Sequence, residues 1–326
     1  MDYYLLYAIE MCSFNLAPII VSVYDRLEHL RRCIDALLKN DLAAQSEIYI
    51  VSDAPYKPEH EDAISKVREF AQSINGFKEV HCLFRKHNLG AHESIRNAIE
   101  EVLSIHDCFI FLEDDIVVAK DFLSFMNRGL EYYNNTSSVF AISGFSLPFN
   151  IPADYNADVY FYPCNSPWGF ASWKNRWSSV NLNYYNREAE LLEKGEYSSF
   201  ASIGFYIKGI LRQDSQREIE AMDLRVYYHM FKHNMASVFP VVSKTQNWGF
   251  DGSGEHCGKK DSSWWSKPNM DAKSGDVSFI PFNGYNEQLL KNHRDFQDRI
   301  NGGFIARIFK YTKLYYLIKR TLKHIS

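Results

Sequence analysis

The feature that most constrains the fold of this chain is an alternation of strand-like and helix-like segments through its first 140 residues. Short apolar runs rich in β-branched and aromatic residues predict strands over 18–23, 47–53, 79–84 and 108–115. Apolar residues repeat at helical spacing between and after these runs, which predicts helices over 26–40, 59–74, 92–104 and 121–133. Strands separated by crossover helices form a mostly parallel sheet with helices on both faces. We therefore predict an α/β fold that binds its ligand beyond the carboxyl ends of the strands.

The rest of the chain is less regular. Residues 139–185 are rich in aromatic residues, Asn, Ser and Pro, and two helices are predicted near 199–212 and 215–233. We expect 1–140 and 141–276 to be two halves of one compact unit, followed by a tail over 277–326.

Composition and cysteine usage narrow the class of protein. The formal net charge of -4 argues against a general nucleic-acid binder. The six cysteines form no CxxC pair and several lie in apolar runs, which is typical of reduced thiols in a cytoplasmic protein. The N-terminal MDYYLLYAIEM lacks the basic region of a signal peptide, and the sequence has no apolar run of 18 residues that would predict a membrane span.

Three consecutive carboxylates, Glu113, Asp114 and Asp115, follow the apolar run of the fourth predicted strand. Such charges repel one another and resist burial, so a positive partner is expected beside them. Mg²⁺ and Mn²⁺ prefer oxygen ligands and often bridge one or two carboxylates to a diphosphate. The triplet therefore indicates a metal site that stabilises a departing diphosphate. The alternative is a solvated acidic turn that caps the following helix.

Four stretches resemble the GT-A glycosyltransferases, which use nucleotide sugars: VSVYDRLEHLRRCIDALLKN, IVSDAP, RKHNLGAHESIRNAI and FLEDDIVVAKDFL. The sequence is similar to the bacterial family 2-like enzymes and, most of all, to the branch related to N-acetylglucosaminyltransferase I. The resemblance covers roughly residues 17–257. It implies the GT-A fold, a Rossmann-like, mostly parallel sheet, with the nucleotide sugar bound by 1–140 and the acceptor by 141–276.

The resemblance also implies roles for the carboxylates. Asp115 is the expected direct ligand of Mn²⁺ or Mg²⁺. Asp114 would contact the ribose or a metal-bound water, and Glu113 would support both.

On the nucleotide side, the resemblance assigns Asp53 to the base and places Arg85 and Asn88 near the nucleotide. Gly90 would allow the tight loop before the next helix. Asp53 is alternatively an ordinary turn residue, and Arg85 a surface charge.

An inverting sugar transfer also needs a base that takes the proton of the acceptor hydroxyl. The helix predicted over 215–233 has an apolar stripe that comprises Ile219, Asp223, Val226 and Met230. A carboxylate on such a stripe is costly unless it is paired or used, and partial burial raises its pKa, so Asp223 is the candidate base. The alternative is a salt bridge from Asp223 to Arg225 or Arg217, and Glu220 is the reserve candidate.

Two loops of the second half add candidates. In SPWGFASWKNRW (166–177), Trp168 is expected to stack on a sugar, whereas Trp173 and Trp177 are expected in the core. In the stretch NWGFDGSGEHCGKK, His256 is a candidate ligand for the metal or the diphosphate. The alternative is that this lone histidine binds no metal.

The last 24 residues, 303–326, intersperse basic residues with apolar and aromatic ones and contain no acid. This pattern is typical of a basic amphipathic helix on an anionic membrane surface. The alternative is a helix packed on the body of the protein. A membrane-surface helix would bring a cytoplasmic enzyme to the inner face of the cell membrane.

These features predict a metal-dependent, inverting glycosyltransferase. It would move a sugar from a UDP-sugar to a hydroxyl of a glycan or lipid-linked acceptor in surface polysaccharide synthesis. A nucleotidyltransferase is disfavoured because VYDRLEH lacks a glycine-rich basic loop. A non-catalytic carbohydrate-binding protein would leave the acidic triplet and Asp223 without a role.

Overall fold

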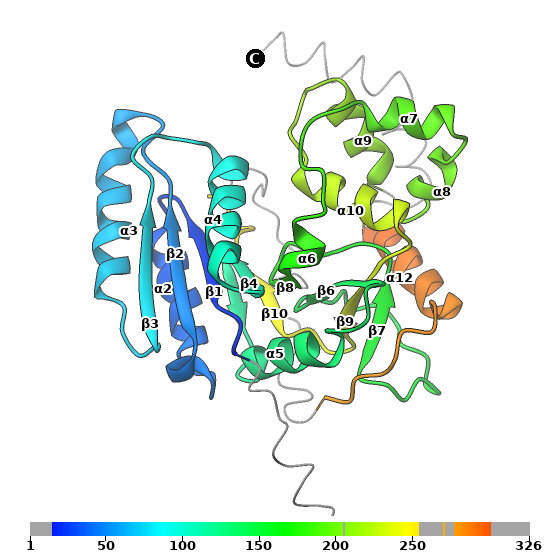
Figure 1. Cartoon of the computed structure of the whole chain (residues 1–326), viewed down its shortest axis with the longest axis horizontal. Helices are drawn as coiled ribbons and strands as arrows, with labels where there is room; N and C mark the ends of the chain where they lie inside the picture. The colour runs from blue at the N-terminus through cyan, green and yellow to red at the C-terminus, as the bar shows by residue number, and fades with distance from the viewer. Residues whose placement is uncertain (1–14, 205, 254–269, 271–276, 301–326) are drawn as a thin grey trace, which may run out of the picture.

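The computed structural model describes residues 15–204, 206–253, 270 and 277–300. An eight-stranded sheet in the order β3-β2-β1-β4-β8-β6-β9-β7 runs through the molecule (Figure 1). Its first four strands are mutually parallel: β1 (Ile19–Val23), β2 (Glu47–Ser52), β3 (Glu79–Phe84) and β4 (Cys108–Glu113). The predicted α/β fold with a mostly parallel sheet in this part of the chain is confirmed.

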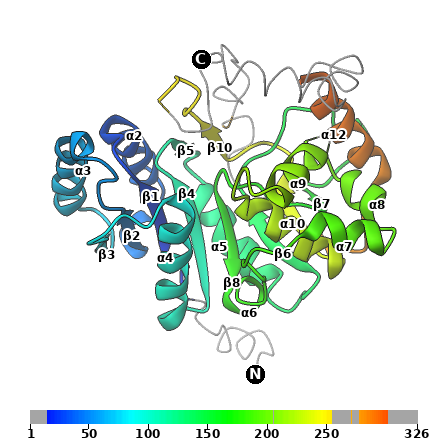
Figure 2. The ribbon, with the colours of Figure 1, turned by 90° about the horizontal axis from the view of Figure 1, so that it is seen from above.

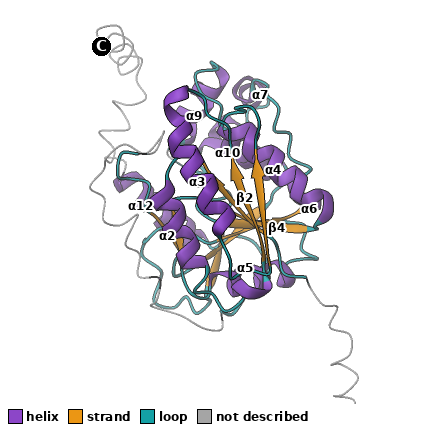
Figure 3. Cartoon of the chain, turned by 90° about the vertical axis from the view of Figure 1, so that its left-hand side faces the viewer, coloured by secondary structure: helices purple, strands orange, loops and turns teal. Residues whose placement is uncertain are grey.

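Helices cover both faces of the parallel strands, as their amphipathic patterns predict. They are α2 (Leu27–Leu37), α3 (Glu61–Ser73), α4 (Ala91–Ile105) and α5 (Phe122–Tyr132), with short 3₁₀ turns at Ala43–Gln45 and Pro58–His60. Helices α2, α3 and α5 share one hydrophobic core with the sheet, and α4 shares another on the opposite face. Figure 3 shows helices on both sides of β2 and β4.

The second half contributes four more strands to the same sheet: β6 (Val139–Ser143), β7 (Val159–Tyr162), β8 (Phe170–Trp173) and β9 (Ala236–Pro240). Strand β8 inserts antiparallel between β4 and β6, so the sheet continues across residue 140 without a break. These four strands were not predicted from the sequence. They are short, aromatic and completely buried, so they lack the alternation that marks a strand with one solvated face.

A separate two-stranded ribbon pairs β5 (Ile116–Val118) with β10 (Thr245–Asn247). Because β5 begins directly after Asp115, this pairing brings the segment after β10 to the end of β4.

The helices of the second half gather on the side of β6, β9 and β7, away from α2 and α3 (Figure 2). They are α6 (Lys174–Trp177), α7 (Arg187–Glu193), α8 (Tyr197–Ala201), α9 (Ile207–Ser215), α10 (Met222–Lys232) and α12 (Glu287–Ile300). In the described residues, no helix combines the length and apolarity needed to cross a membrane. The tail at 303–326 lies outside the described residues.

One predicted helix is wrong at its start. The helix expected over 215–233 begins at Met222, because α9 ends at Ser215 and a non-helical segment separates the two. Arg217 in that segment has a φ of 57°, a left-handed conformation that interrupts a helix. Ile219 is 37% exposed and does not belong to the buried stripe of α10.

Candidate active site

The acidic triplet lies where β4 ends, between the parallel sheet and the β5–β10 ribbon. Glu113 is the last residue of β4, and Asp114 and Asp115 form the turn before β5. Asp114 and Asp115 are only 2% and 5% exposed. The alternative of a solvated acidic turn is therefore wrong, and these buried charges require partners.

The expected positive partner is Arg26, which comes from the loop after β1. Its Nη2 donates to Oδ1 of Asp114, and its Nε donates to Oδ2 of the same carboxylate at 3.2 Å. Nη2 also lies 3.0 Å from Oδ2 of Asp115. Arg26 was not among the site residues predicted from the sequence. A signal was present, because Arg26 follows a strand that a parallel sheet can place beside β4.

The triplet remains short of positive charge even with Arg26 in place. Burial raises the pKa of Glu113 well above its usual range, and the charges of Asp115, Asp223 and Asp114 raise it further. Burial also raises the pKa of Asp114, although the Arg26 guanidinium opposes the shift. An additional cation beside these oxygens would therefore be stabilised.

The donor set fits a divalent metal ion. Oδ1 of Asp115 is buried and has no hydrogen-bond partner among the described residues. An orphaned carboxylate oxygen beside two further carboxylates is the kind of ligand that Mg²⁺ or Mn²⁺ takes.

The segment after β10 packs directly on Asp115. The Trp248 backbone N–H donates to the Asp115 carbonyl at 2.9 Å. A Cβ at Gly249 would lie 2.1 Å from Oδ2 of Asp115, so only glycine permits this approach.

Helix α2 holds the same segment from the other side. His29 Nε2 lies 3.2 Å from Oδ2 of Asp251, and the Arg32 guanidinium lies 4.6 Å from the Trp248 ring centroid. The described part of this segment ends at Ser253, three residues before His256. His256 itself lies outside the described residues, so its role as a metal ligand stays a prediction.

Trp168 lies beside this segment. Its ring makes edge contacts with Phe145 and Phe250, at centroid distances of 4.5 and 5.9 Å, and its carbonyl accepts from Thr245 Oγ1 at 2.8 Å. Trp173 and Trp177 are each 4% exposed, which confirms that they belong to the core. The sugar contact predicted for Trp168 stays a prediction.

Asp53 fastens the loops after β2 and β3 to each other. Its Oδ1 accepts from the Ala54 amide at 2.8 Å, and its Oδ2 accepts from the Gly90 amide at 2.8 Å. Both oxygens also lie 3.0 Å from the Leu89 amide nitrogen. Asn88 adds a bond from Nδ2 to the Ala54 carbonyl at 2.7 Å. Asp53 therefore shapes this edge of the sheet, and its contact with a base stays a prediction.

Arg85 extends along α4. Its Nη1 donates to Oε1 of Glu101 at 2.6 Å, and its Nη2 donates to the Ser94 carbonyl at 3.4 Å. An arginine that the sequence analysis did not name, Arg68 of α3, donates from Nη2 to the Asp53 and Arg85 carbonyls at 3.1 and 3.0 Å. Arg68 thus ties the ends of β2 and β3 together, while the nucleotide contact of Arg85 stays a prediction.

Asp223 lies in the first turn of α10 and remains accessible to solvent, whereas Val226 and Met230 of the same helix are buried. The surrounding protein nevertheless desolvates the carboxyl and raises its pKa to about 6. Its charge also raises the pKa of Glu113, so Asp223 lies within electrostatic reach of the acidic triplet.

The two arginines proposed as salt-bridge partners of Asp223 are engaged elsewhere in the described structure. Arg225 pairs with Oε1 of Glu220 at 2.8 Å, and the Arg217 guanidinium lies 4.2 Å from the Tyr184 ring centroid. The reserve candidate, Glu220, is thereby held by Arg225. This arrangement favours Asp223 as the group with a chemical role.

Comparison with known proteins found similarity to parts of the chain. Residues 19–153 match the family model described as Glycosyl transferase family 2. This match, over less than half of the chain, supports a glycosyltransferase. The matched range contains β1–β6 and the acidic triplet, whereas Trp168, Asp223 and the β10 segment lie beyond it. No curated protein sequence matches the chain.

Solved structures with similarity to the chain include two glycosyltransferases. One is the mannosyltransferase PcManGT from Pyrobaculum calidifontis, in complex with GDP-Man and Mn²⁺, at 15% identity and a TM-score of 0.35 over 48% of this chain. The other is TarS of S. aureus, at 12% identity and a TM-score of 0.39 over 69% of this chain. The aligned parts span 44% and 35% of the length of those two chains. The resemblance to the N-acetylglucosaminyltransferase I branch stays a prediction.

The matched range also contains a cluster of two acidic residues and a histidine. Ligand atoms of Glu47, Glu79 and His81 lie within 4.8 Å of one another. Glu47 and Glu79 begin β2 and β3, so the cluster occupies the amino end of the parallel strands, and Glu47 already pairs with Lys78 at 2.7 Å. The cluster is therefore separate from the candidate active site at the carboxyl end.

Proposed function

We propose that the protein is a metal-dependent, inverting glycosyltransferase that moves a sugar from a UDP-sugar to a hydroxyl of a glycan or lipid-linked acceptor. One observation carries the proposal. Asp223, an accessible carboxylate with a raised pKa, comes from the second half, and its charge raises the pKa of Glu113 in the range that matches the family 2 model. Different halves would thus supply a base and a donor-binding acidic cluster to one site.

Asp115 would hold Mn²⁺ or Mg²⁺, with His256 as a further ligand. The orphaned Oδ1 of Asp115 supports this assignment. When bound, the metal would act as a Lewis acid that stabilises the charge of the departing diphosphate. Asp114 would contact the ribose or a metal-bound water, and Glu113 would support the two aspartates.

Asp223 would act as the general base. Its carboxylate takes the proton of the acceptor hydroxyl while the oxygen attacks the anomeric carbon. The bond from that carbon to the diphosphate oxygen breaks as the new glycosidic bond forms, and UDP leaves with the electron pair. Attack from the face opposite the leaving group inverts the anomeric configuration. The pKa of about 6 leaves Asp223 charged, and still basic, at neutral pH.

The loops after β2 and β3 would bind the nucleotide. Asp53 would contact the base, with Arg85 and Asn88 near the nucleotide, and Trp168 would stack on the sugar. The Asp53 and Asn88 hydrogen bonds support a preformed edge for this purpose.

The proposed acceptor and cellular place rest on the sequence pattern of the tail, which lies outside the described residues. A basic amphipathic helix over 303–326 would hold the enzyme on the inner face of the cell membrane, beside a lipid-linked acceptor of surface polysaccharide synthesis. The rival functions are less well supported, because a nucleotidyltransferase or a sugar-binding protein would not call for a family 2 domain.

Calorimetry with UDP and GDP, each with and without Mn²⁺, tests the donor assignment. We expect tight binding of UDP only with the metal, followed by UDP release from one UDP-sugar in the presence of acceptor. Proton NMR of the first product would give its anomeric configuration. Metal-independent nucleotide binding, or retention of configuration, would contradict the proposal.

A further inference from the structure

Asp223 stands next to a segment that has no regular structure of its own. Residues 216–221 separate α9 from α10, and Arg217 adopts a φ of 57° within them. A base must be held within a fraction of an ångström to act well. Some other contact must therefore fix the start of α10.

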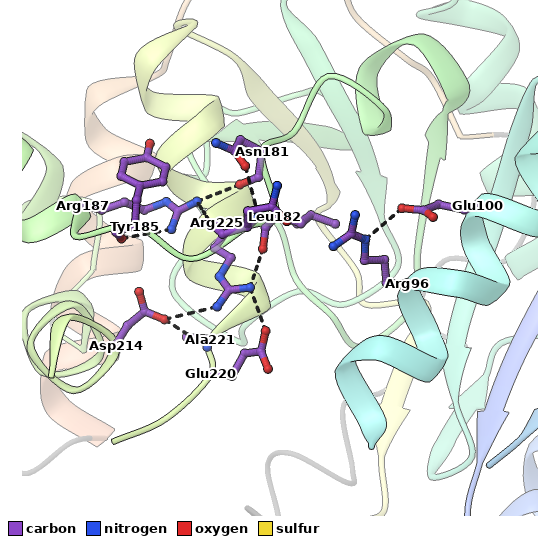
Figure 4. Close-up of polar contacts among 11 residues, drawn as sticks. Arg96, Glu100, Asn181, Leu182, Tyr185, Arg187, Asp214, Glu220, Ala221 and Arg225 are labelled. Atoms are coloured by element: carbon purple, nitrogen blue, oxygen red, sulfur yellow. Dashed lines mark hydrogen bonds and ion pairs between the residues drawn. The ribbon is translucent and has the colours of Figure 1, made fainter. Parts of the chain in front are cut away.

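Arg225 makes that contact from inside the protein (Figure 4). It is 6% exposed, and its Nη1 donates both to the Leu182 carbonyl and to Oε1 of Glu220, the latter at 2.8 Å. Its Nη2 lies 3.8 Å from Oδ1 of Asp214, which is 1% exposed near the end of α9. The same Oδ1 accepts from the Ala221 amide at 3.4 Å.

A second buried arginine extends the network. Arg187 donates from Nη2 to the Asn181 and Asn183 carbonyls, at 2.7 and 3.0 Å, and its guanidinium stacks 3.9 Å from the Tyr185 ring centroid. It thereby fastens the loop whose Leu182 carbonyl Arg225 uses (Figure 4). Arg96 and Glu100 of α4, in the same view, form a separate pair at 2.9 Å.

Helix geometry explains why Arg225 does not neutralise Asp223. Residues two apart on a helix point to different sides, so Arg225 enters the protein while Asp223 stays accessible. Arg225 is therefore placed to hold the helix end without quenching the carboxylate.

We propose that Arg225 is a positioning residue that holds Asp223 against the acceptor hydroxyl by fastening 214–221 and the 181–186 loop to α10. The inference rests on the proposed function, because it assumes that Asp223 is the base. Asp214 supplies the buried counter-charge, since a buried guanidinium needs one.

The test compares R225M and R225K with R176M. Arg176 is the matched control: it is 4% exposed and donates to the Tyr133 and Asn134 carbonyls, far in sequence from Asp223. We expect R225M to bind UDP with Mn²⁺ as wild type does and to lose about 100-fold in kcat. R225K should recover part of that loss. R176M should lower the Tm while leaving kcat within about twofold.

The pH profile adds a readout that a structural role alone would not move. In a plot of kcat/KM against pH, R225M should shift the acidic limb from its wild-type position, because the surroundings of Asp223, and with them its pKa, would change. If R225M fails to fold, D214N weakens the same network without removing the guanidinium and should cost about tenfold in kcat. An unchanged kcat in R225M, or in its substitute D214N, would overturn the proposal.

A D223N variant separates this proposal from the one on which it rests. If D223N keeps its turnover, the assignment of the base has failed. If D223N is inactive while R225M is as active as R176M, only the positioning role has failed.

Discussion

The two halves of the sheet position their functional groups by different means. On the side of β1–β4, the site consists of strand ends, and backbone amides hold the carboxylate of Asp53. On the side of α7–α10, the candidate base lies after an irregular segment. Buried Arg225 bonds to Glu220 of that segment, and buried Arg187 bonds to the neighbouring loop at Asn181. The difference indicates that the proposed donor site follows from sheet topology, whereas the proposed acceptor site depends on long side-chain networks.

The largest expected effect tests the donor side. D115N removes the charge of the proposed metal ligand while conserving its shape, so we expect turnover to fall by about 10⁴-fold. Metal-dependent UDP binding, measured by calorimetry, should disappear as well. Retained metal-dependent binding in D115N would move the metal site elsewhere.

The next effect tests the acceptor side. D223N should lower kcat by about 10³-fold while metal-dependent UDP binding stays at the wild-type level. The surrounding protein desolvates the carboxylate. Its replacement should therefore leave the Tm, measured above pH 7, unchanged or higher than that of the wild type. Weakened UDP binding in D223N would mean that Asp223 also contributes to nucleotide binding, which would contradict the proposed division between donor and acceptor residues.

A third variant probes the contact between the two sides. G249A would drive a methyl group into Asp115, so we expect a loss of about 30-fold in kcat/KM as the β10 segment shifts. G129A is the control, because its added methyl would lie 3.1–3.2 Å from the Ile142 side chain of the core and not against Asp115. Steady-state kinetics of both should show a large effect in G249A alone.

The effect of pH on wild-type kcat/KM should be smaller than the effect of G249A. Asp223 must be charged to act, so kcat/KM should rise with pH through about 6 and be about tenfold lower at pH 5 than on the plateau. A raised pKa means that the native state holds the proton more tightly than the unfolded chain does. The free energy of unfolding of the wild type minus that of D223N should therefore be greatest below the ordinary carboxyl pKa. This difference should decrease as pH rises through about 6. Thermal melts across pH 4–8 would check the sign.

The smallest effect concerns the preformed nucleotide edge. D53N keeps one acceptor oxygen and loses the other, so we expect a destabilisation of about 1–3 kcal/mol by urea unfolding. The KM for the donor should rise more than kcat falls. A D53N protein with wild-type stability would show that these amide bonds contribute little.

The sequence by itself determined the elements of the first half and the place of the acidic triplet. Local periodicity marks each strand and helix, and a parallel sheet puts the residues after its strands at one edge. The positions of Asp53 and Asp115 could therefore be predicted to within a loop. The same local signal failed for β6–β9, because strands buried on both faces show no alternation.

Only the tertiary structure decided which charges meet. Arg26 and Asp114 lie 88 positions apart, and Arg225 reaches Leu182 across 43. No local pattern encodes such pairs, since a buried charge selects its partner by distance in space after the sheet and helices have packed. The start of α10, and with it the freedom of Asp223 from an ion pair with Arg217 or Arg225, was decided in the same way.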